Sequence, residues 1–193
     1  MSASDSKPPS HPPTNGASAW IARFAPLIAP GARVLDLASG YGRHARFFAA
    51  RGHRVVAVDR DAAALATLAG DARIETRELD LEAGPWPLGR ERFDAIVVAN
   101  YLHRPLFPDL LAALADDGVL LYETFARGNE AHGRPANPDF LLLPDELLQM
   151  AAGRLTVVAF EQGYLPDPSR PAVIQRLAAV ARGRPWPPLL PPF

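Results

Sequence analysis

The sequence predicts an α/β protein built around a mostly parallel sheet with helices on both faces. Short apolar runs with strand character alternate along the chain with helix-like segments that end at glycine or proline. One run, 93–99, is almost continuously apolar, as in a parallel strand that is buried on both faces. Such alternation is typical of strand–helix–strand units whose strands pair in parallel.

The boundaries of the predicted elements follow from helix-capping and helix-breaking residues. Pro26 bounds the first helix, Gly52 ends the second, and Asp61 caps the third. The predicted strands are 33–37, 54–58, 73–79, 93–99, 119–123, 155–160 and 172–180, and the predicted helices are 17–25, 42–51, 61–69, 108–115 and 144–153.

The last two predicted strands leave little room for a crossover helix. We therefore expect a hairpin there, which gives a Rossmann-like seven-stranded sheet with one antiparallel edge strand. At 193 residues the chain suits a single domain, which we place at residues 17–181. We expect residues 1–16, rich in Ser, Pro and Asn, to be disordered, and the proline-rich tail, 182–193, to be extended.

The composition excludes several classes of protein. Apolar residues make up 48% of the chain, charged residues 21%, and the net charge of −1 gives no overall field that attracts nucleic acid. The absence of cysteine excludes disulfides, thiolate metal sites and a cysteine nucleophile. There is no membrane-length apolar run and no signal-peptide pattern, so we expect a cytoplasmic protein. Lys7 is the only lysine, which with the alanine and proline content suggests a GC-rich bacterial genome.

The segment 33–59 predicts a nucleotide-sized pocket. It reads as a buried strand, a glycine turn, a helix and a second strand that ends in a carboxylate. Gly40 and Gly42 allow a ligand to approach the backbone closely, and the helix start behind them offers unpaired N–H groups. Asp59, followed by Arg60, stands where an acid can accept hydrogen bonds from ribose hydroxyls.

The order of residues in the turn indicates which nucleotide is bound. A dinucleotide fingerprint would read G-x-G-x-x-G/A after the strand. Here Asp36 precedes Gly40 and Gly42. A carboxylate at that point repels a pyrophosphate but suits an ammonium or sulfonium cation, which favours S-adenosylmethionine. The segment resembles motif I of class I S-adenosylmethionine-dependent methyltransferases, usually D-x-G-x-G-x-G, with Ala38 at the first glycine position.

The resemblance covers about residues 33–180 and implies the seven-stranded methyltransferase fold. In an open α/β sheet, ligands bind at the carboxyl ends of the strands. The cofactor ligands implied there are Asp36 and the Gly40–Gly42 backbone for the methionine end, Asp59 for the ribose, Asp80 and the Leu81 N–H for adenine, and Asn100 for the ammonium group.

Some of these acids also have a purely structural interpretation. Asp36 could cap the helix behind it, as acids near helix N-termini do. Asp59 could cap the following helix, although Asp61 is better placed. Asp80 could belong to a solvated charged face with Glu78 and Glu82.

Candidate catalytic residues follow the fourth and fifth predicted strands. Methyl transfer requires an in-line approach of the acceptor, and a base is needed only if the acceptor carries a proton. His103 has the intrinsic pKa of a base at neutral pH, and Glu123 ends the fifth strand. Tyr101 could line the acceptor pocket or belong to the core.

The polar stretch 125–138 is long for a compact domain, so we interpret it as a lid over the substrate. Asn129, His132 and Arg134 are its candidate substrate-binding residues. Arg134, and Arg104 before it, could each bind an acidic substrate group bidentately or simply be solvated. We predict no metal site, since His132 has no third ligand nearby.

Two segments refine the resemblance. Asn-Tyr-Leu-His-Arg-Pro at 100–105 and Phe-Ala-Arg-Gly-Asn-Glu at 125–130 are similar to a bacterial methyltransferase group often labelled tellurite-resistance-like. The label indicates a sub-family and names no substrate.

The sequence thus predicts an S-adenosylmethionine-dependent methyltransferase that is a monomer or homodimer and acts on a small molecule. We expect neither a membrane partner nor nucleic acid, since no basic stripe or stacking platform is evident, although an RNA or protein acceptor stays open. One alternative is a nicotinamide-dependent oxidoreductase, which Asp36 and the absence of a Tyr-x-x-x-Lys pair disfavour. The other is a non-catalytic binding module, which Ala38 slightly favours.

Overall fold

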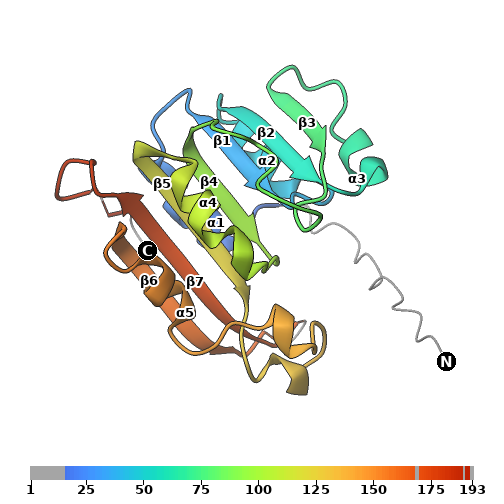
Figure 1. Cartoon of the computed structure of the whole chain (residues 1–193), viewed down its shortest axis with the longest axis vertical. Helices are drawn as coiled ribbons and strands as arrows, with labels where there is room; N and C mark the ends of the chain where they lie inside the picture. Colours follow the sequence, from blue (N-terminus) through green and yellow to red (C-terminus); the bar gives the residue numbers. More distant parts are fainter. Residues whose placement is uncertain (1–15, 168–169, 189, 192–193) are drawn as a thin grey trace.

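A computed structural model describes residues 16–167, 170–188, 190 and 191, in which seven strands form a sheet of order β3-β2-β1-β4-β5-β7-β6 (Figure 1). β7 runs antiparallel to β5 and β6, and the other neighbouring strands pair in parallel. The predicted fold class is confirmed, with the reversed strand set next to the edge strand β6. The strands are β1 Arg33–Leu37, β2 Arg54–Asp59, β3 Ile74–Glu78, β4 Phe93–Ala99, β5 Leu114–Phe125, β6 Leu155–Leu165 and β7 Ala172–Ala181.

Helices cover both faces of the sheet. α1, α2 and α3 contribute to one apolar core, and α4 and α5 contribute to the other. Neighbouring β1 residues divide between the two: Val34 belongs to the first core, and Leu35 to the second. The helices are α1 Ala19–Phe24, α2 Arg43–Ala49, α3 Ala62–Ala66, α4 Phe107–Ala112 and α5 Glu146–Ala151, and the 3₁₀ turns are η1 Ala25–Leu27, η2 Arg104–Leu106, η3 Asn129–Ala131 and η4 Pro138–Phe140.

Several element boundaries differ from the predicted ones. Asp61 does cap α3, but the helix ends at Ala66, because Thr67 turns its hydroxyl back to the Ala64 carbonyl. β5 begins at Leu114, earlier than predicted, because Leu114 pairs with Phe93 before an irregularity in the register. β6 extends to Leu165 because the hairpin pairing with β7 continues to its tip.

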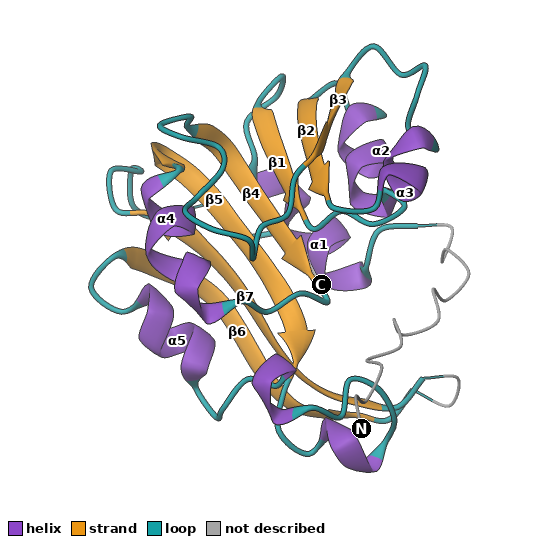
Figure 2. Ribbon diagram, turned by 45° about the vertical axis from the view of Figure 1, so that its right-hand side comes forward, coloured by secondary structure: helices purple, strands orange, loops and turns teal. Residues whose placement is uncertain are grey.

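The parallel strands β1 to β5 end on the same edge of the sheet (Figure 2). The candidate residues that follow these strands in the sequence therefore lie at this edge. The chain after β5 folds back, and an isolated parallel bridge joins Ala126 to Leu142. The segment 126–146 therefore lies beside the carboxyl end of β5.

The amino edge of the sheet carries structural ion pairs and part of the tail. Glu91 pairs with both Arg33 and Arg77, and these hydrogen bonds lower its pKa to about 2. In the tail, Arg184 donates to the carbonyls of Leu27 and Asp117 at 2.6 and 3.4 Å. Most of the predicted N-terminal disorder, residues 1–15, lies outside the described residues. None of the helices in the described ranges combines the length and the apolar character needed to span a lipid bilayer.

Candidate functional site

The turn after β1 has a left-handed backbone at alternate positions. Ala38, Gly40 and Gly42 have φ angles of 54°, 52° and 70°. Glycine adopts this region freely, whereas an alanine there brings its Cβ too close to the following carbonyl. The turn therefore explains why the motif usually carries glycine where this chain has Ala38.

The two glycines serve different purposes. A Cβ on Gly42 would lie 2.4 Å from the Leu68 side chain, so this glycine lets the turn pack against the segment after α3. A Cβ on Gly40 would meet no atom within 4 Å. Gly40 thus faces open space, where a ligand can approach the backbone.

Asp59 ties the end of β2 to this turn. One carboxylate oxygen accepts from the Gly40 N–H at 2.7 Å and the other from the Asp61 N–H at 2.9 Å. The Ser39 N–H donates to the Val58 carbonyl at 2.9 Å beside them. Since each carboxylate oxygen has further lone pairs, Asp59 can still accept hydroxyl hydrogen bonds from a ligand.

Asp36 lies beneath the turn, 1% exposed, and accepts from the Ala45 N–H at 2.8 Å. Burial raises its pKa to about 7, and the charge of Asp59 adds to this, while the Ala45 N–H and Arg43 oppose it. The geometry matches the helix-capping alternative. With its pKa raised to about 7, the Asp36 carboxyl beneath the turn changes between its neutral and charged forms around neutral pH.

The loop after β3 contains a hydrogen bond from its backbone to one of its acidic side chains. The exposed Asp80 accepts from the Glu82 N–H at 2.9 Å. The Leu81 side chain is buried in the core, so only the backbone of this residue can contact a ligand. Two side-chain atoms near this side of the sheet, Ser39 Oγ and Trp86 Nε1, are shielded from solvent without a hydrogen-bond partner in the described part of the chain.

The chain bends sharply after β4. Asn100 is exposed with a φ of 57°, and its N–H donates to the Glu123 carbonyl at 3.0 Å. The next residue, Tyr101, is partly buried, and its carbonyl accepts from the Tyr122 hydroxyl at 2.9 Å. Burial, followed by the charge of Glu82, raises the pKa of the Tyr101 phenol. Tyr101 is therefore protonated at neutral pH and suits a hydrogen-bond donor better than a base.

The other two catalytic candidates stand at the same edge. His103 is partly exposed at the start of η2. Glu123 lies opposite Ala99 in the sheet register, and its side chain is 13% exposed. A guanidinium nitrogen of Arg43 lies 3.8 Å from a carboxylate oxygen of Glu123. Sequence reasoning missed Arg43, although its place directly after Gly42 was a usable signal.

Arg104 has another role than the predicted contact with substrate. Its guanidinium holds Glu146 with two hydrogen bonds of 2.6 and 2.9 Å. It also donates to the carbonyls of Asp139 and Leu141. With these partners Arg104 is occupied, so we assign it to the anchoring of segment 126–146.

Asn129 is likewise a structural residue. Its side chain, 2% exposed, donates to the Pro135 carbonyl at 3.0 Å and accepts from the Val173 N–H at 3.2 Å. These bonds attach segment 126–146 to β7. Because burial and bonding remove Asn129 from the surface, it is not available to a substrate.

The remaining predicted substrate residues stay exposed. The His132 ring lies against the Tyr164 ring, with centroids 4.6 Å apart. Arg134 is exposed in the same segment. Arg60, which the sequence placed with the cofactor residues beside Asp59, is exposed after β2. Among the described residues, no three histidine, aspartate or glutamate side chains gather so as to hold a metal ion.

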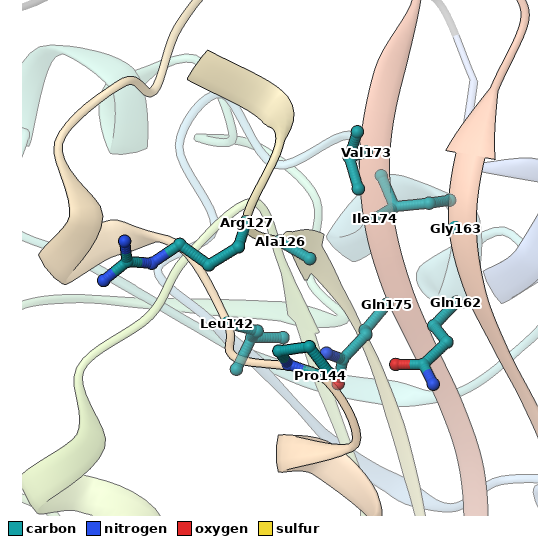
Figure 3. A pocket seen from close by; sticks show the side chains of 9 residues that line it. All are labelled: Ala126, Arg127, Leu142, Pro144, Gln162, Gly163, Val173, Ile174 and Gln175. Atoms are coloured by element: carbon teal, nitrogen blue, oxygen red, sulfur yellow. The ribbon is translucent and has the colours of Figure 1, made fainter. Parts of the chain in front are cut away.

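A cavity of about 220 Å³ opens beside segment 126–146, beyond the end of β5 (Figure 3). Apolar side chains, among them Leu142 and Val173, form much of its wall. The Arg127 guanidinium points away from it (Figure 3). The Gln175 side-chain amide donates to the Leu143 carbonyl. The lining residues are Ala126, Arg127, Leu142, Pro144, Gln162, Gly163, Val173, Ile174 and Gln175.

Comparison with protein families gives a match over the same part of the chain that builds the glycine turn. Residues 34–117 match the methyltransferase domain family. This part of the chain, a little under half of it, is similar to that family. The match includes the turn, Asp59 and the end of β4, and it stops just before the apolar part of β5.

Solved structures share the fold. TehB from Haemophilus influenzae is 20% identical, with a TM-score of 0.68 over 84% of this chain and 61% of that one, so the chain spans less than two thirds of that protein. A TehB-like S-adenosylmethionine-dependent methyltransferase from Corynebacterium glutamicum is also 20% identical, with a TM-score of 0.61 over 83% of this chain and 86% of that one. At this identity the likeness establishes the fold.

A third structure adds a ligand-bound comparison. The 1,6-didemethyltoxoflavin-N1-methyltransferase from Burkholderia thailandensis, solved with 1,6-didemethyltoxoflavin and S-adenosylhomocysteine, is 25% identical. It aligns with a TM-score of 0.60 over 83% of this chain and 75% of that one. No match to a curated protein sequence was found.

Proposed function

We propose that this protein transfers a methyl group from S-adenosylmethionine to a small-molecule acceptor. The observation that carries the proposal is the Gly40 turn held by Asp59 at the carboxyl edge of a methyltransferase domain. As the donor, S-adenosylmethionine would supply an electrophilic methyl group on a sulfonium.

The residues present fit this cofactor. The space in front of Gly40 leaves the backbone accessible, and the buried Ser39 Oγ and Trp86 Nε1 lack partners that a ligand could provide. Asp59 would hold the ribose, and the loop with Asp80 and Leu81 would hold the adenine. Acids around the turn favour a cationic ligand over a pyrophosphate. This distribution of charge disfavours the nicotinamide alternative.

We place the acceptor beside the ends of β4 and β5, under segment 126–146. A cavity of about 220 Å³ lies on the other side of this segment, against β6 and β7, and it is somewhat smaller than a typical small-molecule site. His103 is the candidate base, since an imidazole can accept a proton and this one is partly exposed at the same edge of the sheet. The Burkholderia enzyme, named for its action on 1,6-didemethyltoxoflavin, supports a small acceptor. The TehB and TehB-like structures support, more weakly, a place in the tellurite-resistance-like group.

The acceptor class can be tested with methyl-labelled S-adenosylmethionine and a cell extract separated into small-molecule, protein and RNA fractions. We expect label in the small-molecule fraction, and less of it with Asp59→Ala. Label confined to protein or RNA would overturn the proposed acceptor class. Binding of the cofactor with no transfer to any fraction would favour the non-catalytic alternative instead.

A further inference from the structure

We propose that β6 is the interface through which two copies of this chain form a dimer, with their β6 strands paired antiparallel across a two-fold axis. β6 is at one edge of the sheet (Figure 1). Among the described residues, no strand pairs with its outer side, which therefore presents backbone N–H and C=O groups as a template for a further strand. The inference goes beyond the proposed function and does not depend on it.

The two edges of the sheet differ in how they are protected against such pairing. β3, at the opposite edge, has five residues, among them Glu75, Arg77 and Glu78. Short length and charged side chains are the usual protection of an edge strand. β6 has 11 residues, no lysine or proline, and a single charged residue, Glu161, whose carboxylate pairs with Arg176 at 3.4 Å. The protection present at β3 is thus missing at β6.

The second half of β6 is both exposed and regular. Residues 161–165 are all exposed, with Tyr164 at 54% and Leu165 at 37%. An irregularity in the pairing with β7 lies between Val157 and Ala159, and the pairing is regular from there to the end of the strand. Since a bulge turns an edge away from a partner, a second strand fits best beyond it.

The symmetry of a dimer restricts which residues can meet. In an antiparallel pair, directly opposed side chains lie on the same face of the sheet, so under a two-fold axis one residue of the strand meets its own copy. With the axis at Gln162, Tyr164 lies opposite Phe160 of the second copy, and Glu161 opposite Gly163. Aromatic pairs across strands are favourable, and this pair occurs twice. An axis at Glu161 would set two carboxylates against each other, so we place the axis at Gln162.

The chain contains no cysteine, so single introduced cysteines can test this register. Gln162→Cys should give a covalent dimer with a short bismaleimide cross-linker, because residue 162 meets its own copy across the axis. Glu161→Cys projects from the other face and meets Gly163, so we expect at most about a tenth of that yield. The matched control is Thr76→Cys, exposed on β3, which should give no covalent dimer.

Sedimentation equilibrium of the full chain tests the interface without cross-linking. We expect a dimer of the wild type, and a dissociation constant at least roughly tenfold higher when Tyr164→Lys and Leu165→Lys are combined, because lysine protects an edge strand. Thr76→Lys on β3 should leave the dissociation constant unchanged.

Two results would overturn the inference: a monomeric wild type at about 100 μM, or a dimer that the two lysines do not weaken. A Gln162→Cys variant that cross-links no better than Thr76→Cys would overturn the register and the interface together. The wild-type sedimentation and the cysteine variants retain the test if the lysine variant fails to fold.

Discussion

The Asp59 carboxylate accepts a hydrogen bond from the Gly40 N–H at 2.7 Å and so joins the end of β2 to the turn after β1. We expect Asp59→Ala to weaken S-adenosylhomocysteine binding at least tenfold, because it removes both the ribose acceptor and the support of the turn. Asp59→Asn keeps one oxygen for Gly40 and should lose less. Calorimetric titration measures both, and equal affinity of Asp59→Ala and wild type would refute the assignment.

The two glycines of the turn should respond differently to alanine. Gly42→Ala drives a Cβ into Leu68 in addition to straining the backbone, so we expect it to lower the free energy of unfolding by roughly 1–3 kcal/mol. Gly40→Ala meets no protein atom and should chiefly weaken ligand binding. Chemical denaturation and ligand titration of both variants separate these effects. A larger stability loss for Gly40→Ala would contradict the geometry.

Ala38→Gly should stabilise the protein. Alanine in the left-handed region costs about 1–2 kcal/mol, and the greater freedom of glycine in the unfolded chain offsets part of the gain. We therefore expect the free energy of unfolding to rise by roughly 0.5–1 kcal/mol. Ala66→Gly, at the exposed end of α3, is the matched control and should destabilise. Stability that falls with Ala38→Gly would show that the strain at this residue is not relieved by glycine.

The burial of Asp36 should make stability depend on pH. Its pKa is raised from 3.8 to about 7 in the folded protein, so between these values the folded state holds a proton that the unfolded state has lost. The contribution of Asp36 to the free energy of unfolding therefore falls as the pH rises from about 4 to about 7, and is constant above that. Arg43 and Asp59 face the same carboxylate and set the position of this window.

Asp36→Asn tests this dependence, because the amide oxygen can still accept from the Ala45 N–H but cannot ionise. We expect a flatter profile of melting temperature against pH in this window than the wild type shows. At pH 8 the variant should melt at a higher temperature than the wild type. Parallel profiles for the two proteins would show that Asp36 is ionised throughout.

Arg104 anchors segment 126–146 through Glu146 and the backbone of η4. Removing the guanidinium frees two carbonyls and the carboxylate, so we expect Arg104→Met to increase amide hydrogen exchange severalfold in residues 138–146. Arg104→Lys keeps the charge but not the bidentate geometry and should be intermediate. Unchanged exchange in this segment would mean that other contacts hold it in place.

The sequence contained enough information for the fold and for the glycine turn after β1. The run 93–99 predicted a doubly buried strand because parallel strands are apolar on both faces, and β4 has that burial. The Gly40–Gly42 turn was identifiable because its residue types reflect a local backbone requirement. A backbone requirement of this kind can be recognised from the residue types of a single sequence.

The acceptor side depends on contacts between distant segments. Arg104 was a candidate for substrate binding because its type and position suited an acidic group, but its partner Glu146 lies 42 residues away. Asn129 was a candidate for the same reason, since nothing in the sequence indicated that its side chain would accept from the Val173 N–H, 44 residues away. Arg43 was overlooked because its contact with Glu123 depends on which strands are neighbours in the sheet.

The most direct test of the cofactor assignment is calorimetric titration of the purified protein with S-adenosylmethionine and, separately, with NADH and NADPH. We expect binding of S-adenosylmethionine alone, because acids rather than phosphate-binding groups surround the turn. Binding of a nicotinamide nucleotide in its place would contradict the assignment.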